Sequence, residues 1–282
     1  MPELPELQAV AEGLTAAIAG VEITGVSIDS PAVLQHAGTD PAALVGRSIR
    51  AVERRGKHLL VHADDLTMVV HLMSAGRIGL AAPTGTRAPR WVSLRLALAG
   101  GDELRLRERS TRHRARIAVM PTDRVAGHPP IARLGPDPLG LSPDRWRQQL
   151  GAPPGVLHTA LRQGPRIAGI GRCYASEIMW AARLPPLMRT AALDDAMAQR
   201  LAAAADLVLQ GALTRAREHI TTDLPDRERR VTVVHGHFGE PCVRCGSELA
   251  RIGFNDYELV YCPNCQTNGR RYADRRMSRL LR

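Results

Sequence analysis

The sequence predicts an α+β fold in three consecutive parts: a β-rich part, a helical part and a small cysteine module. Between residues 21 and 119, short runs of alternating apolar and polar residues are separated by Gly, Pro, Asp and Thr. This pattern is typical of an antiparallel sandwich or barrel. Segments with helical spacing of apolar residues follow between residues 143 and 219. Four cysteines then lie between residues 242 and 265.

The β-rich part is preceded by a predicted helix over residues 6–19. Pro5 stands where a first-turn proline is tolerated, and the apolar residues at helical spacing are Leu7, Val10, Ala11, Leu14 and Ile18. Short predicted strands follow up to residue 119. The stretch 126–143 is rich in Pro and Gly, which is typical of a connection between domains.

The middle of the chain is predicted to form helices over residues 143–151, 156–162, 173–183 and 195–219. Asp194 is the expected N-cap of the last helix, and its buried residues should include Met197, Leu201, Ala204 and Val208. The charged, turn-prone segment 220–231 is predicted to be a mobile loop. We therefore expect three domains, over residues 1–125, 126–234 and 235–282.

Composition restricts the class of protein. Hydrophobic residues make up 44% of the 282 positions, enough for a sizeable core and too many for global disorder. No apolar run approaches the roughly 18 residues that cross a bilayer, and the N-terminus lacks the pattern of a secretory signal. The sequence thus predicts a cytoplasmic protein without a membrane partner.

The net charge of +10 comes from 38 Lys and Arg against 28 Asp and Glu. Such an excess indicates a polyanionic partner, with nucleic acid first among the candidates. An arginine-heavy proteome would also raise the charge, because Lys57 is the only lysine. The arginines that flank the last cysteine pair either face phosphates or form a solvated tail; they are Arg270, Arg271, Arg275, Arg276 and Arg279.

The cysteine module has two C-x2-C pairs separated by sixteen residues, formed by Cys242, Cys245, Cys262 and Cys265. Each pair can place two thiolates on one tight turn, and two such turns facing each other across a hairpin would complete the tetrahedral shell of one structural Zn²⁺. The predicted hairpin runs over 249–254 and 257–261, with a turn at 255–256. The alternatives to a zinc site are two disulfides or a redox-active cysteine pair. Disulfides are disfavoured in a cytosolic protein, and a redox pair would need only one of the two C-x2-C motifs. Cys173 is expected to be a small buried residue.

The N-terminus contains groups suited to covalent catalysis. Removal of Met1 would expose Pro2 as a secondary amine, and an unperturbed α-amino group titrates near 7.7–8.0. Such an amine can attack a sugar C1′ and form an iminium. Glu3 and Glu6 place carboxylates nearby for acid–base work. The alternative is an ordinary lead into a helix with acidic residues in its first turn.

Six segments carry a joint resemblance that covers nearly the whole chain. They are PELPE at 2–6, RRGKHLL at 54–60, HLMSAG at 71–76, ARLGPDPL at 132–139, GIGRCYASEIMWAARLPP at 169–186 and GEPCVRCG…YCPNCQ at 239–266. The combination resembles the formamidopyrimidine-DNA glycosylase / endonuclease VIII family of base-excision repair enzymes, whereas GIGRCY alone is not specific.

The resemblance implies a β-sandwich domain, a helix–two-turn–helix domain and a zinc finger, with damaged double-stranded DNA bound between the domains. It further implies a monomeric, nucleoid-associated enzyme that flips out and excises an oxidised base and then cuts the abasic strand. Pro2 would be the nucleophile, Glu3 the acid–base group, and Glu6 would hold the amine and the local structure. The remaining implied roles concern the lesion and the DNA backbone: proton donation or phosphate contact by Lys57, and DNA contacts by His71, Gly171, Arg172, Tyr174 and Tyr257.

Residue-level alternatives remain for two of these positions: Lys57 could be a solvated lysine and His71 a strand histidine with its hydrogen bonds satisfied. Several positions also depart from the family pattern. The residue after GxG is Arg172 instead of Asn, and the zinc-hairpin arginine is replaced by Tyr257. The wedge methionine position holds Ser74, one residue after Met73, and His235 stands where a Tyr is common. The loop at 108–116 reads ERSTRHRAR and lacks an aromatic residue.

Two further hypotheses come from other classes. One is a catalytically weak protein that binds damaged DNA or abasic sites, and the other is a zinc-containing transcription factor. The latter leaves PELPE and Lys57 unexplained. Because Tyr257 supplies no permanent positive charge, β-elimination is predicted more firmly than δ-elimination.

Overall fold

A computed structural model describes the chain except for residues 36–37, 84–90, 111–113, 227–229, 255–256 and 273–282. The chain divides into two compact units, which are residues 1–133 with 213–229, and residues 134–212 with 230–282. The first unit therefore combines the N-terminal part with a segment that comes much later in the sequence. The three domain boundaries expected from the sequence stay a prediction.

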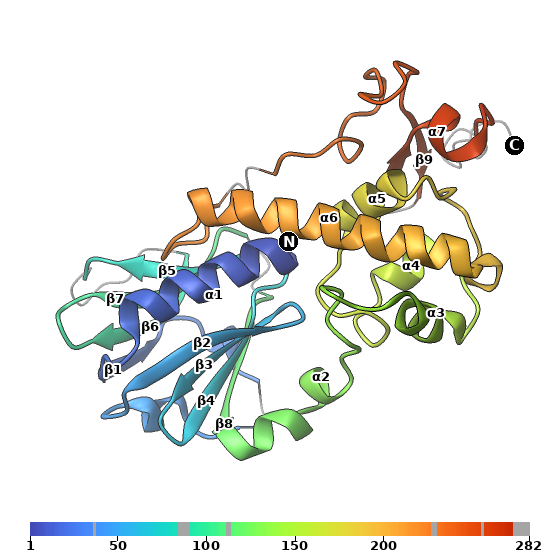
Figure 1. Cartoon of the computed structure of the whole chain (residues 1–282). Helices are drawn as coiled ribbons and strands as arrows, with labels where there is room; N and C mark the ends of the chain where they lie inside the picture. The colour runs from blue at the N-terminus through green and yellow to red at the C-terminus, as the bar shows by residue number, and fades with distance from the viewer. Residues whose placement is uncertain (36–37, 84–90, 111–113, 227–229, 255–256, 273–282) are drawn as a thin grey trace, which may run out of the picture. The chain divides into compact units, whose positions relative to one another are not determined.

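The first unit contains helix α1 and two four-stranded antiparallel sheets (Figure 1). Helix α1 spans Leu4–Ile18, with Pro5 in its first turn as predicted. One sheet has the order β1-β6-β7-β5 and the other the order β2-β3-β4-β8. The strands are β1 (Ile23–Ile28), β2 (Ile49–Arg55), β3 (His58–Ala63), β4 (Leu66–His71), β5 (Gly76–Ala81), β6 (Val92–Leu98), β7 (Glu103–Glu108) and β8 (Arg116–Pro121).

A single apolar core joins α1 to both sheets. The buried side of α1 includes Leu7, Val10 and Leu14, and these residues cluster with Leu59 of β3 and Leu96 of β6. The core is built almost entirely from Leu, Val, Ile and Ala, as the low aromatic content requires. The predicted β-rich part is thus a sandwich covered by the N-terminal helix, and short 3₁₀ turns connect its strands at Pro31–Val33 and Pro41–Leu44.

The predicted connection at 126–143 is partly helical, because a 3₁₀ turn at Thr122–Gly127 leads into α2 (Pro129–Ala132). The second unit then holds α3 (Pro143–Gly151), α4 (Leu157–Leu161), α5 (Arg172–Ala181) and a 3₁₀ turn at Thr190–Ala192. Helix α6 (Asp195–His219) follows, and its residues from 213 onward belong to the first unit. The cysteine module contributes β9 (Ala250–Gly253), β10 (Glu258–Tyr261) and α7 (Pro263–Thr267).

Helix α6 begins as the sequence predicts. Asp194 Oδ1 accepts a hydrogen bond from the backbone N–H of Met197 at 2.7 Å, which is the geometry of an N-cap. The predicted buried face is only partly correct, because Leu201 and Ala204 are buried whereas Met197 and Val208 are half-buried. The fully buried positions include Ala198, Ala205 and Leu209. In a run of alanines no bulky side chain marks one face, so the sequence pattern indicates the buried face only approximately.

The segment after α6 forms a strap along the edge strand β5, and we use this term for residues 221–226. Leu224 N–H donates to the carbonyl oxygen of Ile78 at 2.9 Å, and Leu80 N–H donates to that of Thr222 at 2.9 Å. Gly13 of α1 leaves room for the strap, since a Cβ there would collide with the carbonyl oxygen of Thr221. These contacts were not predicted from the sequence, where only a mobile loop was expected.

Two arginines of the first sheet, one buried and one half-buried, fix the strap. Arg107 of β7 forms a bidentate ion pair with Asp223, whose longer hydrogen bond is 2.8 Å. The side chain of Arg77 donates to the backbone oxygens of Pro225 at 2.7 Å and Asp226 at 2.9 Å, and Arg77 is only 7% exposed. The strap is therefore held by charge-assisted hydrogen bonds in addition to its backbone pairing.

Candidate functional site

The N-terminal candidate residues lie at the first turn of α1. Pro2, Glu3 and Glu6 are all buried, with both carboxylates 3% exposed. Glu3 is the N-cap residue, and its backbone N–H donates to Glu6 Oε2 at 2.8 Å. This bond is one half of a capping box, so Glu6 fixes the direction of the chain just after Pro2. The predicted nucleophile and acid–base residues therefore share one ordered turn.

Lys57 lies in the tight turn of the β2–β3 hairpin. The turn consists of Gly56 and Lys57, and Gly56 has φ +60°. Glycine at the first central position is typical of a type II′ turn, the form that matches the twist of a hairpin. Arg54, near the end of β2, donates to Gln8 Oε1 of α1 at 2.9 Å. This bond places the N-terminal half of α1 beside the strand end that leads into Lys57.

His71 ends β4 and packs against His58 of β3, with ring centroids 4.6 Å apart. Burial and the nearby charge of Lys57 lower the pKa of His71, and burial with the neighbouring His71 lowers the pKa of His58 to about 4. His71 Nδ1 faces the backbone N–H of Met73 at 3.1 Å and must accept from it. The neutral ring therefore carries its proton on Nε2, where it can act as a donor.

Two connections near these residues differ from the family pattern noted above. Met73 adopts a positive φ of +52° in the turn between β4 and β5, while the following Ser74 is exposed. The loop after β7 is held at its far end by Glu108, whose buried carboxylate accepts from the backbone N–H groups of Arg114 and Ala115 at 2.9–3.1 Å. Residues 111–113 of that loop lie outside the described residues.

The helical candidates gather at the N-terminal end of α5. Gly171 is the N-cap and Arg172 the first helical residue. Tyr174 is 4% exposed, and the guanidinium of Arg230 lies 5.5 Å from its ring centroid. Cys173, in the same turn, is 1% exposed, which confirms the small buried residue expected there. The N-terminal end of a helix is electropositive, and the two arginines add to that potential.

Tyr257 lies just before β10 of the cysteine hairpin and stacks on Phe254, with centroids 4.5 Å apart and planes 11° apart. The guanidinium of Arg162 is 4.4 Å from the Tyr257 centroid and that of Arg172 is 4.9 Å from it. Sequence reasoning identified Tyr257 and Arg172 but missed Arg162. The only available signal was its position at the end of a short helix, which does not indicate a long-range partner.

The four predicted metal ligands are brought together. One Sγ from each of Cys242, Cys245, Cys262 and Cys265 lies within 4.8 Å of the others, and these were the only candidate metal-binding group of three or more residues found among the described residues. A tetrahedral Zn²⁺ with Zn–S bonds of about 2.3 Å would separate its sulfurs by about 3.8 Å. The Sγ atoms of Cys245 and Cys262 are 3.5 Å apart, so the cluster fits zinc closely.

The hairpin around the cysteines forms as predicted. Strands β9 and β10 pair from Ala250 with Tyr261 to Gly253 with Glu258, and the expected turn at 255–256 lies outside the described residues. Leu249 and Val260 pack with the buried cysteines and with Val234. Gln266 of α7 donates to the carbonyl oxygen of Leu184 at 2.8 Å, which attaches the module to the segment after α5.

The basic tail is described only as far as residue 272. Within that part, Arg271 lies 3.6 Å from Glu248.

Glu177 of α5 attaches the segment that precedes the cysteine module. Its carboxylate accepts three backbone N–H hydrogen bonds, from Val233, Val234 and His235, at 2.8–2.9 Å. Glu177 is 5% exposed, so the bonds are shielded from water. Burial lowers the pKa of His235, with a further contribution from Arg230, so this histidine is neutral.

Replacing Glu177 with leucine should release this segment. One buried and two half-buried N–H groups would lose their acceptor, at a cost of about 3 kcal/mol. Hydrogen–deuterium exchange should show lost protection over residues 231–237. A Glu218→Leu variant, which changes an exposed carboxylate of α6, is the matched control. Unchanged protection in Glu177→Leu would show that other contacts hold the segment.

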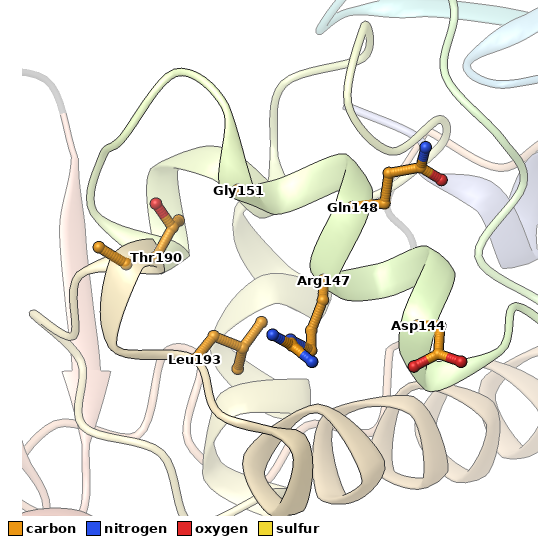
Figure 2. A pocket seen from close by; sticks show the side chains of 7 residues that line it. Asp144, Arg147, Gln148, Gly151, Thr190 and Leu193 are labelled. Atoms are coloured by element: carbon orange, nitrogen blue, oxygen red, sulfur yellow. The ribbon is translucent and has the colours of Figure 1, made fainter.

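A separate pocket of about 460 Å³ lies in the second unit (Figure 2). It is lined by Arg147 and Asp144 of α3 on one side and by Thr190 and Leu193 on the other. Arg147 also forms an ion pair with Asp195 at the start of α6. None of the residues predicted to be functional lines this pocket.

Comparison with known protein families gives two matches. A family model for the formamidopyrimidine-DNA glycosylase N-terminal domain matches residues 1–117. A model for the zinc finger found in FPG and IleRS matches residues 239–268. The second match contains the four clustered cysteines, so the chain has one structural zinc site.

Whole-chain relatives and solved structures agree with these matches. The chain is 31% identical to a formamidopyrimidine-DNA glycosylase of Geobacter sulfurreducens, covering 94% of this chain and 100% of the relative. It is 33% identical to one from Chloroflexus aurantiacus, covering 94% and 98%. A Lactococcus lactis FPG mutant in complex with DNA containing Fapy-dG matches with a TM-score of 0.84 and 26% identity, covering 94% of this chain and 100% of the other. The Lactococcus lactis Fpg bound to DNA with an abasic site has the same TM-score at 25% identity, covering 94% and 99%.

Proposed function

Because the chain belongs to the formamidopyrimidine-DNA glycosylase family, we propose that it excises a damaged base from duplex DNA through the N-terminal amine of Pro2. The family makes it a DNA glycosylase with abasic-site lyase activity that acts on damaged DNA. The observation that best supports the role of Pro2 is the ordered turn that joins it to two buried carboxylates. No described helix is long and apolar enough to cross a membrane.

The proposed reaction begins after Met1 has been removed. The lone pair of the Pro2 nitrogen attacks C1′ of the flipped nucleotide, and the bond between C1′ and the base breaks with its electron pair leaving on the base. The leaving base takes up the proton that the Pro2 nitrogen loses. Glu3 then donates a proton to O4′ as the C1′–O4′ bond breaks with its electron pair going to that oxygen, and the nitrogen lone pair forms the C=N bond of an iminium between Pro2 and C1′. The Glu3 carboxylate then takes a proton from C2′, and the C3′–O bond breaks with its electron pair leaving on the phosphate, which cuts the strand by β-elimination. Water hydrolyses the iminium and restores the amine.

The neighbouring residues support this chemistry. Lys57 sits on a tight turn near the N-terminal half of α1 and near His71, so we assign it to proton donation or a phosphate contact at the lesion. His71, neutral and with its proton on Nε2, would donate to a phosphate oxygen. Glu6 keeps the N-terminal turn in place. Gly171, Arg172 and Tyr174 are assigned to DNA binding at the electropositive end of α5.

Borohydride trapping tests the proposal. The native protein is incubated with duplex DNA that carries an abasic site, and sodium borohydride is added to reduce the iminium to a stable amine. We expect a covalent protein–DNA complex, and peptide mapping should place the DNA on Pro2 as the first residue of the mature chain. Tight binding without a trapped complex would instead indicate a catalytically weak protein that binds abasic sites. A complex mapped to Lys57 would move the nucleophile to that residue.

A further inference from the structure

The positive groups of the second unit converge on Tyr257. Arg162 and Arg172 lie on different helical segments, yet both guanidiniums lie within 5 Å of this one ring centroid, at 4.4 and 4.9 Å. Phe254 stacks against the same ring. Because the face of an aromatic ring carries negative charge, the ring attracts each cation and offsets part of the repulsion between them. The described residues therefore contain two guanidiniums organised around an aromatic side chain.

Arg162 is held by this ring contact without an acidic partner among the described residues, and its buried Nε has no hydrogen-bond partner there. An arginine in a structural role usually pairs with a carboxylate or a carbonyl oxygen. Two carboxylates of the same unit are already engaged: Glu177 accepts three backbone N–H groups, and Glu258 lies 3.4 Å from Arg251. Arg162 as a whole is half-buried, so its Nη donors remain available for an anion from outside the chain.

The histidines around the two arginines are neutral and add no charge of their own. Burial and the adjacent Arg162 lower the pKa of His158 to about 3. His158 stacks near Tyr257, with centroids 6.2 Å apart, and its Nε2 lies 3.3 Å from Ser176 Oγ. The N-terminal end of α5, where Arg172 begins the helix, adds further positive potential. Planar guanidiniums match the oxygens of a phosphodiester in bidentate geometry.

We propose that Arg162 and Arg172 form a phosphodiester clamp on the DNA backbone, with Tyr257 as the positioning residue that holds both guanidiniums. This inference rests on the proposed function, because it takes DNA as the ligand. It assigns binding to Arg162, and it gives Tyr257 a role other than direct DNA contact. The two guanidiniums also supply permanent positive charge beside Tyr257, whose own side chain has none. They can therefore stabilise a departing phosphate during strand cleavage.

The test measures how DNA affinity depends on salt. The probe is a duplex containing a tetrahydrofuran abasic analogue, which the protein can bind but not cleave by β-elimination. The dissociation constant is measured by fluorescence anisotropy at salt concentrations from 50 to 200 mM. A protein that loses one phosphate contact should show a slope of log affinity against log salt that is smaller by about 0.9. Arg162→Gln should show this change and bind about tenfold more weakly at low salt.

Matched variants separate the clamp from general charge and from folding. Arg145→Gln removes an exposed charge of the same unit and should leave the slope unchanged. Arg162→Lys keeps the positive charge but loses the planar group that stacks on Tyr257. It should therefore keep the native dependence of affinity on salt but bind DNA more weakly. Tyr257→Phe keeps the ring face and should behave like the native protein, whereas Tyr257→Leu should resemble Arg162→Gln. Each variant should contain one zinc, as a check of its fold.

The outcomes decide between the hypotheses. If Arg162→Gln contains its zinc and has the same slope of log affinity against log salt as the native protein, the clamp proposal is wrong. If Tyr257→Phe and Tyr257→Leu lose DNA affinity equally, the ring of Tyr257 does not position the arginines. The proposed function is judged separately by borohydride trapping. If the native protein binds the analogue but gives no trapped complex on an abasic site, the Pro2 mechanism fails while the salt slopes still test the clamp.

Discussion

An N-terminal extension that keeps Pro2 inside the chain is expected to abolish the borohydride-trapped complex. In the extended protein the Pro2 nitrogen belongs to an amide, whose lone pair is delocalised into the carbonyl group. It can no longer attack C1′, so neither base release by attack of the amine nor β-elimination through the iminium should be detectable. The measurements are trapping and strand cleavage on duplexes with an abasic site, together with the affinity for the uncleavable analogue. Affinity should fall far less than activity, because the proposed phosphate contacts remain.

A Glu3→Gln variant resolves the acid–base step. Glutamine fits the same buried position but cannot donate or accept the proton, and general acid–base groups typically contribute about 10²- to 10⁴-fold to rate. Base excision should slow by a factor in that range while the free Pro2 amine is retained.

The control for the extended protein carries the same added residues at the C-terminus, where they leave the Pro2 amine free. If the N-terminally extended protein is still trapped at the native rate, the nucleophile is a side chain instead.

Loss of zinc should have the second large effect. In Cys262→Ser, one of four thiolates is lost from a residue that is fully buried and that also caps α7 by accepting the Cys265 N–H at 3.3 Å. Structural zinc in small modules is worth about 10–16 kcal/mol of apparent binding free energy. We therefore expect the variant to lose its zinc and the hairpin β9–β10 to lose its order.

The consequences of zinc loss should extend to DNA binding. Tyr257 and Phe254 flank the hairpin turn, so disorder there would remove the surface on which Arg162 and Arg172 stack. Elemental analysis and hydrogen–deuterium exchange over 239–268 report on the module, and anisotropy reports on affinity. Cys173→Ala is the matched control, because Cys173 is also buried but lies outside the cluster. A well-folded Cys262→Ser protein without zinc would contradict the assignment of the metal as structural.

Local signals in the sequence predicted most of the elements. The spacing of the cysteines anticipated the ligand cluster, Asp194 anticipated the start of α6, and Pro5 fits the first turn of α1. In each case the physical cause lies within a few residues: a turn that presents two thiolates, a side chain that caps a free N–H, or a ring whose φ suits a helix.

Contacts between distant segments could not be predicted in this way. Glu177 accepts from residues more than fifty positions later, and Arg107 pairs with Asp223 across an even longer separation. Nothing in the sequence near Arg162 indicates that its partner is the ring of Tyr257. Such pairs depend on the packing of whole elements, which neither periodicity nor spacing specifies. The buried face of α6 similarly includes Ala198 and Ala205, which were not predicted to be buried. In an alanine-rich helix no row of large apolar side chains marks the face that will be buried.

The strap over β5 can form only late in the synthesis of the chain. Strand β5 is an edge strand of its sheet, and an uncovered edge can pair with another chain. The residues that cover it end at 226, so they leave the ribosome well after the eight strands of the sandwich. Until then the nascent N-terminal unit carries an open edge, and a fragment ending at residue 133 would keep it permanently. The arginines that fix the strap therefore also protect the finished sandwich from edge-to-edge association.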